Sequence, residues 1–166
     1  MRDISARAVT AQSLASRALG WSLEQNFYVD LDIFQLDLNC VFRRGWLFAG
    51  HACQVAQPGQ YFCYQVGGDS LVIIHGHDGQ IRALFNVCRH RGSIICKEPS
   101  GQLTRLVCPY HQWTYDTDGR LLKNTWMPDN FEKATFSLAQ ATIKNVAGLL
   151  FVSLAESVPE FPAEED

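Results

Sequence analysis

Two short segments of the chain each carry a cysteine and a histidine at a spacing that suits metal binding. The first reads Cys-Arg-His-Arg-Gly over residues 88–92, and the second reads Cys-Pro-Tyr-His over residues 108–111. A thiolate and a neutral imidazole are both good ligands for transition metals. Two such loops could hold one metal centre from opposite sides. The four candidate ligands are Cys88, His90, Cys108 and His111.

The segments around these loops predict short antiparallel strands. Runs rich in β-branched and aromatic residues are separated by turn signals, among them Pro58-Gly59, Gly67-Gly68 and Asp78-Gly79. This close and regular spacing is typical of an antiparallel meander that forms a small sandwich or barrel. The predicted strands span residues 46–51, 61–66, 70–75, 81–86, 113–115, 120–122, 138–146 and 149–154.

The two ends of the chain depart from this pattern. Near the N-terminus, Thr10 and Asp30 are candidate caps of two short helices, the second running from Leu31 to about Phe42. The residues expected on one apolar face of that second helix are Phe34, Leu38, Val41 and Phe42. The predicted organisation is a helical extension over 1–42, a β domain over 43–155 with ligand loops at 86–96 and 106–116, and an acidic, Pro-containing linker or tail over 156–166.

Composition limits the classes of function. The chain has 166 residues, of which 47% are hydrophobic and 19% charged, and these values suit one globular domain with a short extension. The net charge is −3 and no run of Lys or Arg exceeds two residues, so nucleic acid is not expected as a partner. No segment has the pattern of a signal peptide or a membrane span, which predicts a cytoplasmic protein without membrane contact.

The remaining cysteines and histidines receive plainer interpretations. In a reducing compartment, cysteines are expected to be metal ligands or buried thiols rather than disulfides. His75 and His77 form a His-x-His pair without an evident third ligand, so an exposed hairpin is expected there. For the four candidate ligands a structural zinc ion stays open, because zinc also accepts two cysteines and two histidines. The cysteines without metal-like spacing, predicted as small buried residues, are Cys40, Cys53, Cys63 and Cys96.

The residues around the candidate ligands carry a family resemblance. Residues 88–92 and residues 108–115, which read Cys-Pro-Tyr-His-Gln-Trp-Thr-Tyr, resemble the cluster-binding loops of Rieske [2Fe–2S] proteins. This resemblance implies a mainly β fold: a Rieske-type antiparallel β-sandwich with a two-loop cluster-binding subdomain, preceded by short N-terminal helices. It also implies that Cys88 and Cys108 bind one iron of a [2Fe–2S] cluster and that the two histidines bind the other.

Residues inside the loops indicate the low-potential branch of that family. High-potential Rieske proteins carry one extra cysteine in each loop, joined by a disulfide, and here Ser93 and Tyr110 stand at those positions. Those proteins also place a hydrogen-bonding serine where this chain has Trp113. Fewer donors to the cluster sulfurs leave more negative charge on them and lower the reduction potential. The resemblance is therefore to the Rieske proteins of bacterial oxygenases and of their ferredoxins.

The leading segment favours an oxygenase over a ferredoxin. Residues 28–34 and 42–51 look like the N-terminal region of Rieske oxygenase large (α) subunits, and the similarity runs from about residue 25 to residue 155. Gln112 replaces a glycine that is common in aromatic-ring-hydroxylating members, and its surroundings are similar to the glycine-betaine and quaternary-ammonium demethylating branch. The alternative is a stand-alone low-potential Rieske ferredoxin that only carries electrons.

Membership in the oxygenase branch implies a defined role and partners. An NAD(P)H-dependent reductase or a ferredoxin would donate electrons to the cluster, and a mononuclear Fe(II) in a C-terminal domain would accept them. In the family, two histidines and one carboxylate hold that second iron, and this sequence has no histidine after His111. The chain alone is therefore expected to transfer electrons without a catalytic residue of its own, within a complete subunit that forms a homotrimer.

Overall fold

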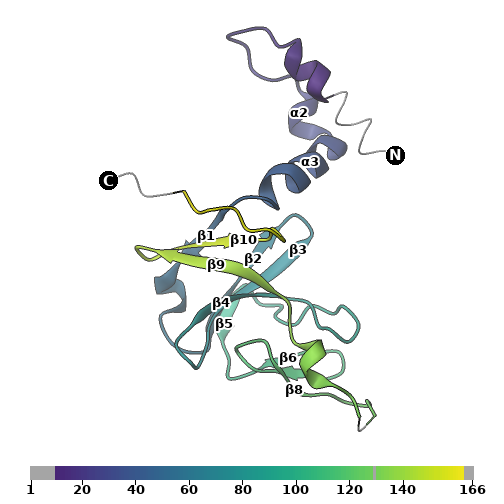
Figure 1. Cartoon of the computed structure of the whole chain (residues 1–166), viewed down its shortest axis with the longest axis vertical. Helices are drawn as coiled ribbons and strands as arrows, with labels where there is room; N and C mark the ends of the chain where they lie inside the picture. Colours follow the sequence, from purple (N-terminus) through teal and green to yellow (C-terminus); the bar gives the residue numbers. More distant parts are fainter. Residues whose placement is uncertain (1–9, 129, 163–166) are drawn as a thin grey trace.

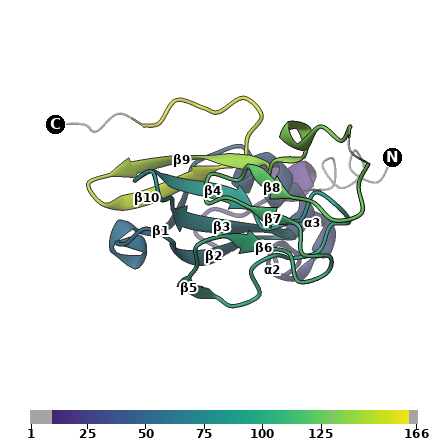
Figure 2. The same ribbon diagram turned by 90° about the horizontal axis from the view of Figure 1, so that it is seen from below.

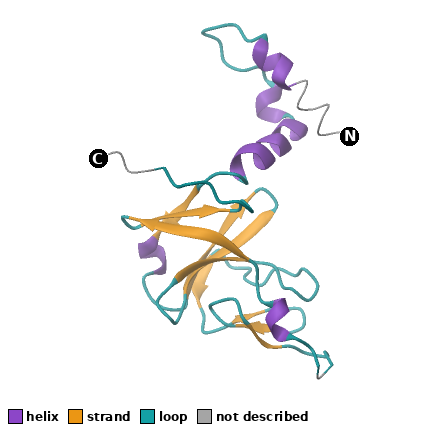
Figure 3. Ribbon diagram, in the orientation of Figure 1, coloured by secondary structure: helices purple, strands orange, loops and turns teal. Residues whose placement is uncertain are grey.

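The protein is a mainly β domain with a helical arm, as the sequence predicts (Figure 1 and Figure 3). The computed structural model describes residues 10–128 and 130–162. The helical segments are residues 10–15, α2 (Asn26–Val29), α3 (Leu31–Asp37), the π-helical turn η1 (Leu38–Phe42) and the 3-10 turns η2 (Ala52–Val55) and η3 (Lys133–Phe136). The strands are β1 (Leu47–His51), β2 (Gln60–Val66), β3 (Asp69–His75), β4 (Ile81–Phe85), β5 (Ser100–Gln102), β6 (Leu106–Val107), β7 (Thr114–Tyr115), β8 (Leu121–Lys123), β9 (Gln140–Val146) and β10 (Leu149–Ser153).

The strands form one long sheet and one small sheet. The long sheet has the order β1-β10-β9-β4-β3-β2-β5, and the small sheet has the order β6-β7-β8. All of these pairings are antiparallel. Strand β9 joins the two halves of the long sheet, because it pairs with β10 and also, through Ala141 opposite Ala83, with β4. The small sheet lies at the end of the molecule away from the helical arm (Figure 1 and Figure 2).

Strand β3 shows how the sequence builds two cores. Its residues 71–74 read Leu-Val-Ile-Ile and are all buried. Because side chains alternate between the faces of a strand, Leu71 and Ile73 enter one hydrophobic cluster, with Val55 and Leu150, and the other two enter a second cluster. The first cluster lies within the long sheet. The second joins the long sheet to the small sheet and the metal-ligand loops, through residues such as Leu106 and Leu121.

The strand predictions are largely confirmed, and the two strands that were missed are short. Strand β5 is three residues and fully exposed, and β6 is two residues. Segments of this length carry too few residues to show an alternating pattern.

Gly67, in the turn between β2 and β3, has a positive φ of 57°. A Cβ there would lie 2.6 Å from a methyl carbon of Leu38, so the helical arm packs directly on this turn.

The helical arm confirms one predicted cap and corrects two other predictions. The Asp30 side chain accepts hydrogen bonds from the backbone N–H groups of Asp32 (2.8 Å) and Ile33 (3.2 Å) at the start of α3. Thr10, predicted as a cap, is itself helical. The predicted apolar face is confirmed at Leu38, which is buried, and is wrong at Phe34, Val41 and Phe42, which are exposed. Within α3 the buried residues are Ile33 and Leu36. Val41 and Phe42 lie on the wider π turn, which does not continue the α-helical spacing of that face.

The chain after β10 lies against the long sheet at its described positions. The Trp46 indole N–H donates to the carbonyl of Pro159 at 2.9 Å. The ring of Phe161 packs edge-on against Trp46 and Phe151, with ring centroids 5.3 and 5.1 Å apart, and Lys144 Nζ lies 4.4 Å from its centroid. The residues predicted as a linker are therefore attached to Trp46, β9 and β10 as far as Phe161, and the end of that predicted segment falls outside the described residues.

All six cysteines lie in the described part of the chain and none of them forms a disulfide. Cys96 is buried as predicted, and Cys63 is half-buried. The prediction is wrong for Cys40 and Cys53, which are exposed. Cys40 lies on the π turn, where only Leu38 is buried, and Cys53 lies on η2, where only Val55 is buried.

Within residues 10–128 and 130–162 no helix is long and apolar enough to cross a membrane.

Candidate metal centre

The two ligand loops are matched in backbone geometry. In the first, between β4 and β5, the N–H of Cys88 donates to the carbonyl of Ser93 at 2.8 Å. In the second, between β6 and β7, the N–H of Cys108 donates to the carbonyl of Trp113 at 2.8 Å. The carbonyl of each cysteine in turn accepts a hydrogen bond from the backbone N–H four positions further along the chain. The donors are Gly92, at 3.0 Å from Cys88, and Gln112, at 2.9 Å from Cys108. Gly92 and Gln112 both have a positive φ, of 71° and 58°.

A buried asparagine holds the first loop to the sheet. The Asn86 side chain is 1% exposed, and its Oδ1 accepts from the N–H groups of Cys96 (2.8 Å) and Ile95 (3.2 Å) while its Nδ2 donates to the Cys96 carbonyl (2.8 Å). A buried amide that satisfies several backbone groups fixes the loop, because leaving those groups unpaired is unfavourable. No pattern in the sequence predicts this role for Asn86, since its partners lie nine and ten residues further along the chain.

The structure brings the four candidate ligands together as two pairs. Cys88 and Cys108 are buried, at 2% and 1% exposure, belong to the same hydrophobic cluster, and lie near enough for the Cys108 thiol to raise the pKa of Cys88. The rings of His90 and His111 are half-buried, with centroids 4.7 Å apart. The cysteines thus form an inner pair and the histidines an outer pair. This separation matches the division of ligands between two irons that the resemblance implies.

The imidazoles are prepared to bind a metal. The Nδ1 atoms of both His90 and His111 are buried and have no hydrogen-bond partner among the described residues. A buried nitrogen without a partner is unfavourable, and a metal ion would satisfy its lone pair. Burial lowers the pKa of His90, and the His111 ring and the Arg91 guanidinium lower it further. The neutral imidazole, which is the form that binds metals, is therefore favoured.

The inner pair needs a cation to become fully ionised. Burial raises the pKa of the Cys88 thiol, the Tyr115 hydroxyl lowers it, and the neighbouring Cys108 thiol raises it again. Two thiolates side by side in a buried site repel each other, and a metal removes this repulsion. Metal binding at this site is expected to release protons. The described residues contain no group of three or more His, Cys, Asp or Glu side chains gathered around one ion position.

Tyr115 makes a polar contact that the sequence does not predict. Its hydroxyl accepts a hydrogen bond from the Arg89 N–H at 3.1 Å and lies 3.3 Å from the Cys88 sulfur. Because one lone pair of the hydroxyl already accepts from Arg89, its own hydrogen is free to point at the sulfur. Tyr115 is fully buried beneath the loops. No sequence signal links it to Cys88, since Tyr115 lies on β7 and Cys88 lies on the first ligand loop.

Aromatic side chains enclose the two imidazoles. The indole of Trp113 stacks on His90 with an interplanar angle of 4° and a centroid distance of 4.8 Å. The Tyr110 ring lies 3.8 Å from that of His111, and the exposed Trp126 meets His111 edge-on at 5.6 Å. The Thr125 hydroxyl donates to the backbone carbonyl of His111. These rings exclude water from the parts of the two imidazoles that they contact. Tyr110 and Trp126 are themselves exposed at the surface.

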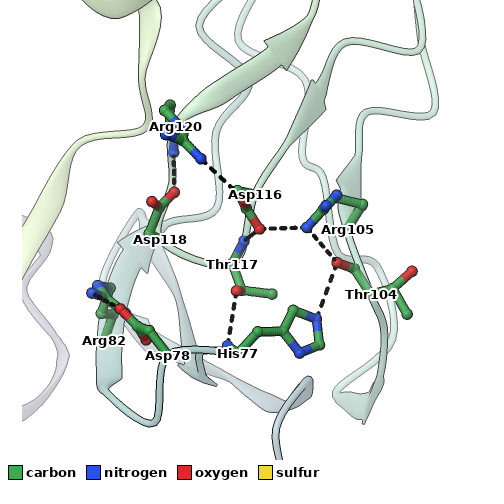
Figure 4. Close-up of polar contacts among 9 residues, drawn as sticks. All are labelled: His77, Asp78, Arg82, Thr104, Arg105, Asp116, Thr117, Asp118 and Arg120. Atoms are coloured by element: carbon green, nitrogen blue, oxygen red, sulfur yellow. Dashed lines mark hydrogen bonds and ion pairs between the residues drawn. The ribbon is translucent and has the colours of Figure 1, made fainter.

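A polar network joins the small sheet to the β3–β4 hairpin (Figure 4). Asp116 forms ion pairs with Arg105 and, at 3.4 Å, with Arg120. The N–H of His77 donates to the Thr117 hydroxyl at 3.2 Å, and its Nε2 lies 3.3 Å from the Thr104 carbonyl. These contacts set the position of the sheet that carries the second ligand loop.

The other histidines of the predicted hairpin do not form a metal pair. His77 is exposed and joins the network just described, whereas His75 Nδ1 lies 2.8 Å from the Val55 carbonyl. The two rings therefore have separate partners. In the same hairpin, Arg82 hydrogen-bonds Asp78 at 2.6 Å and holds the pKa of that carboxyl well below its usual range. The expectation of an ordinary surface hairpin suits this arrangement.

The fold and the site define a class: a β-sandwich domain that presents Cys and His metal ligands on two matched loops. A family model described as "Rieske [2Fe-2S] domain" matches residues 45–143. The chain belongs to that family. Its cofactor class, a Rieske [2Fe–2S] cluster, and the resemblance drawn from the loop residues are thereby confirmed.

The curated relatives are oxygenase subunits. The chain is 43% identical over 155 residues to a glycine betaine monooxygenase oxygenase subunit of Pseudomonas aeruginosa, covering 93% of this chain and 36% of the relative. It is 31% identical over 145 residues to a carnitine monooxygenase oxygenase subunit of Acinetobacter baumannii, covering 86% of this chain and 39% of the relative. The chain therefore spans little more than a third of the length of these relatives. They do not favour the alternative of a stand-alone ferredoxin.

Solved structures give the same fold. A quaternary ammonium Rieske monooxygenase matches with a TM-score of 0.75 and 31% identity, covering 81% of this chain and 37% of that chain. A naphthalene 1,2-dioxygenase from Rhodococcus sp. matches with a TM-score of 0.83, covering 96% of this chain and 37% of that chain. At 24% identity the second match supports the fold alone. The predicted Rieske-type β-sandwich is confirmed.

Proposed function

We propose that this chain is the electron-transfer domain of a Rieske non-haem iron oxygenase. Cys88 and Cys108 would hold the inner iron of the cluster, and His90 and His111 the outer iron through their Nδ1 atoms. When bound, a [2Fe–2S] cluster supplies a site that takes up and releases one electron. The observation that carries the proposal is the pairing of two buried thiols with two buried imidazole nitrogens that lack any other partner in the described part of the chain.

The residues of this chain would hold the cluster and shape its surroundings. The matched loop hydrogen bonds and Asn86 fix the ligand positions, and Tyr115 directs its hydroxyl at an inner sulfur. The histidines lie toward the surface, so an electron donor and an acceptor would approach the outer iron. Arg89 and Arg91 are exposed beside it. We assign them to contact with an acidic face of a partner protein, while plain solvation of the loop tip is the other interpretation.

The complete oxygenase would use this electron on a second iron. A reductase or ferredoxin would reduce the cluster, and the cluster would reduce a mononuclear Fe(II) held by residues outside this chain, in a cytoplasmic homotrimer. No histidine follows His111 here, so the chain by itself would not oxygenate a substrate. The names of the glycine betaine and carnitine monooxygenase relatives support a quaternary ammonium compound as the substrate. Demethylation is the reaction that we propose for it.

The cluster assignment is tested on the purified chain after anaerobic loading with iron and sulfide. The reduced protein should give the EPR spectrum of a mixed Cys/His [2Fe–2S] cluster, with two irons and two sulfides bound per chain. The Cys108→Ala variant should lose that spectrum, whereas Cys40→Ala, which changes an exposed cysteine of the arm, should keep it. A colourless protein with one tightly bound zinc, or a Cys108→Ala variant with the full spectrum, would reject the assignment.

The oxygenase role needs a separate test on the protein encoded by the whole gene. With its reductase and NAD(P)H, that protein should consume O₂ and release formaldehyde when glycine betaine or carnitine is added. Product formation from benzene or naphthalene instead would place the complete enzyme in the ring-hydroxylating branch. Reduction of the cluster without any oxygenation would support the stand-alone carrier.

A further inference from the structure

The indole nitrogen of Trp113 has no hydrogen-bond partner among the described residues. Its side chain has zero exposure, and its Nε1 is buried without an acceptor. A buried N–H group without an acceptor is unfavourable, so such groups are rare in native proteins. Indole is also a donor only, so it cannot be satisfied by an N–H group nearby.

The surroundings of Trp113 supply no acceptor from the described part of the protein. One face of the indole stacks on His90, and the edges of Phe131 and Phe136 meet it at centroid distances of 5.6 and 5.9 Å. The remainder of its neighbourhood is the apolar cluster that contains Cys88 and Cys108. Because the side chain is fully enclosed, neither bulk water nor a partner protein can reach the nitrogen.

The unpaired atoms gather at the metal centre. In the described part of the chain, the buried side-chain polar atoms without a partner are Asn26 Oδ1, His90 Nδ1, His111 Nδ1 and Trp113 Nε1. The asparagine belongs to α2 on the helical arm, and the other three atoms belong to one contiguous set of rings. Bound iron would take the two imidazole nitrogens as ligands. The sulfur atoms of a bound cluster would then be available as acceptors for the indole N–H.

We propose that the Trp113 indole N–H donates a hydrogen bond to a sulfur atom of the bound cluster and raises its reduction potential. This proposal rests on the proposed function. The reduced cluster carries one more negative charge than the oxidised cluster, so a donor aimed at sulfur stabilises the reduced form more. Trp113 is a positioning and tuning residue here, not a catalytic one. The interpretation that Trp113 removes a donor from the cluster is replaced by one in which it supplies a donor from its ring.

The first test compares reduction potentials by protein-film voltammetry on cluster-loaded protein. Trp113→Phe keeps an aromatic ring to stack on His90 and removes the N–H donor. We expect the equilibrium constant for reduction to fall about tenfold, which for one electron is a shift of about 59 mV to more negative potential. Trp126→Phe is the matched control: that indole also meets a cluster histidine but is 82% exposed, and its removal should leave the potential unchanged.

The second test detects the hydrogen bond in the unmodified protein. Pulsed ENDOR of the reduced cluster, in protein grown with ¹⁵N-indole tryptophan, should show a coupled indole nitrogen and its exchangeable proton. A tryptophan that only packs against His90 would give no such coupling to the cluster sulfurs. The signal should persist in Trp126→Phe and vanish in Trp113→Phe.

The outcomes separate this inference from the proposed function. A wild-type protein that does not bind a [2Fe–2S] cluster rejects both. A normal cluster with no coupled indole, together with an unchanged potential in Trp113→Phe, overturns the hydrogen bond and leaves the electron-transfer function standing. Should Trp113→Phe fail to bind the cluster, the ENDOR spectrum of the wild-type protein decides alone.

Discussion

Single residues at the metal centre divide into those that would bind iron and those that would adjust its properties. The first kind can be found from the sequence, because a cysteine and a histidine at short spacing seldom occur twice by chance. The second kind depends on which side chains of distant loops meet. Tyr115 lies on β7 and Cys88 on the first ligand loop, and the tyrosine hydroxyl comes within 3.3 Å of the Cys88 sulfur only because the fold packs the small sheet against that loop. Their contact is a property of the fold.

The Tyr115→Phe variant tests that contact. It removes one hydroxyl that donates toward the Cys88 sulfur and accepts from the Arg89 N–H. We expect loss of about 1 kcal/mol of preference for the reduced cluster, a factor of about five in the reduction equilibrium, and a similar loss of folding stability. Voltammetry and urea unfolding measure the two effects. Tyr64→Phe, on β2 and away from the loops, is the control, and equal potentials in all three proteins would contradict the contact.

Cys96 provides a pH prediction away from the ligands. Burial, and then the neighbouring Cys63, raise its pKa from 9.0 to about 12. A raised folded-state pKa contributes stability that is fully present below pH 9 and is lost as the pH rises toward 12, because the unfolded thiol ionises first. At pH 10 the loss is on the order of 1 kcal/mol. In the Cys96→Ala variant, the melting temperature should fall less between pH 8 and pH 10 than in the wild type. The Cys53→Ala variant, which changes an exposed cysteine, should behave like the wild type. An equal fall in the wild type and both variants would show that the Cys96 thiol ionises as easily in the folded protein as in the unfolded chain.

At the scale of elements, the ligand loops repeat one backbone design. Each is closed by a hydrogen bond from its cysteine and turns through a residue with positive φ, Gly92 in one loop and Gln112 in the other. A left-handed conformation suits glycine and is unfavourable for a residue with a Cβ by about 1–2 kcal/mol. Gln112 therefore carries strain that Gly92 avoids.

The Gln112→Gly variant should relieve this strain. We expect folding stability to rise by about 0.5–1 kcal/mol, since part of the gain is offset by the greater freedom of glycine in the unfolded chain. Gly92→Ala, the converse change in the first loop, should lower stability and cluster retention, although a Cβ there meets no atom within 4 Å. Thermal unfolding of the two variants checks both signs. A stability loss in Gln112→Gly would mean that the glutamine side chain contributes more than its backbone conformation removes.

The sequence predicts the elements well where a pattern has room to develop. Strand β3, buried on both faces, and the Asp30 cap of α3 follow directly from residue type and spacing. Strand β6 has two residues and gives no periodicity, and the π turn after α3 leaves Val41 and Phe42, predicted on the apolar face, exposed. The family and its cofactor follow from the loop residues, whereas the assignment of individual ligands to each iron stays a prediction.

At the scale of the whole molecule, the metal centre lies apart from the helical arm and from the described end of the C-terminal segment (Figure 1). The small sheet and the second ligand loop lie at one end, while the helical arm and the described end of the C-terminal segment lie toward the other (Figure 1). The second hydrophobic cluster carries the loops, and the ring contacts of Phe161 hold the C-terminal segment to β1, β9 and β10. Changes at one end should therefore affect local stability there without altering the cluster.

The Phe161→Ala variant tests this separation. It removes two edge-on ring contacts and the contact with Lys144, which together stabilise the attached segment by about 1–2 kcal/mol. Cleavage by a glutamate-specific protease at Glu156 and Glu160 should accelerate, since the segment would leave the sheet more often. The reduction potential should stay at its wild-type value. Val158→Ala, in the same segment but outside the ring contacts, is the control. Equal cleavage rates for both variants and the wild type would show that Phe161 does not hold the segment. A shifted reduction potential in Phe161→Ala would show that this segment and the metal centre are coupled.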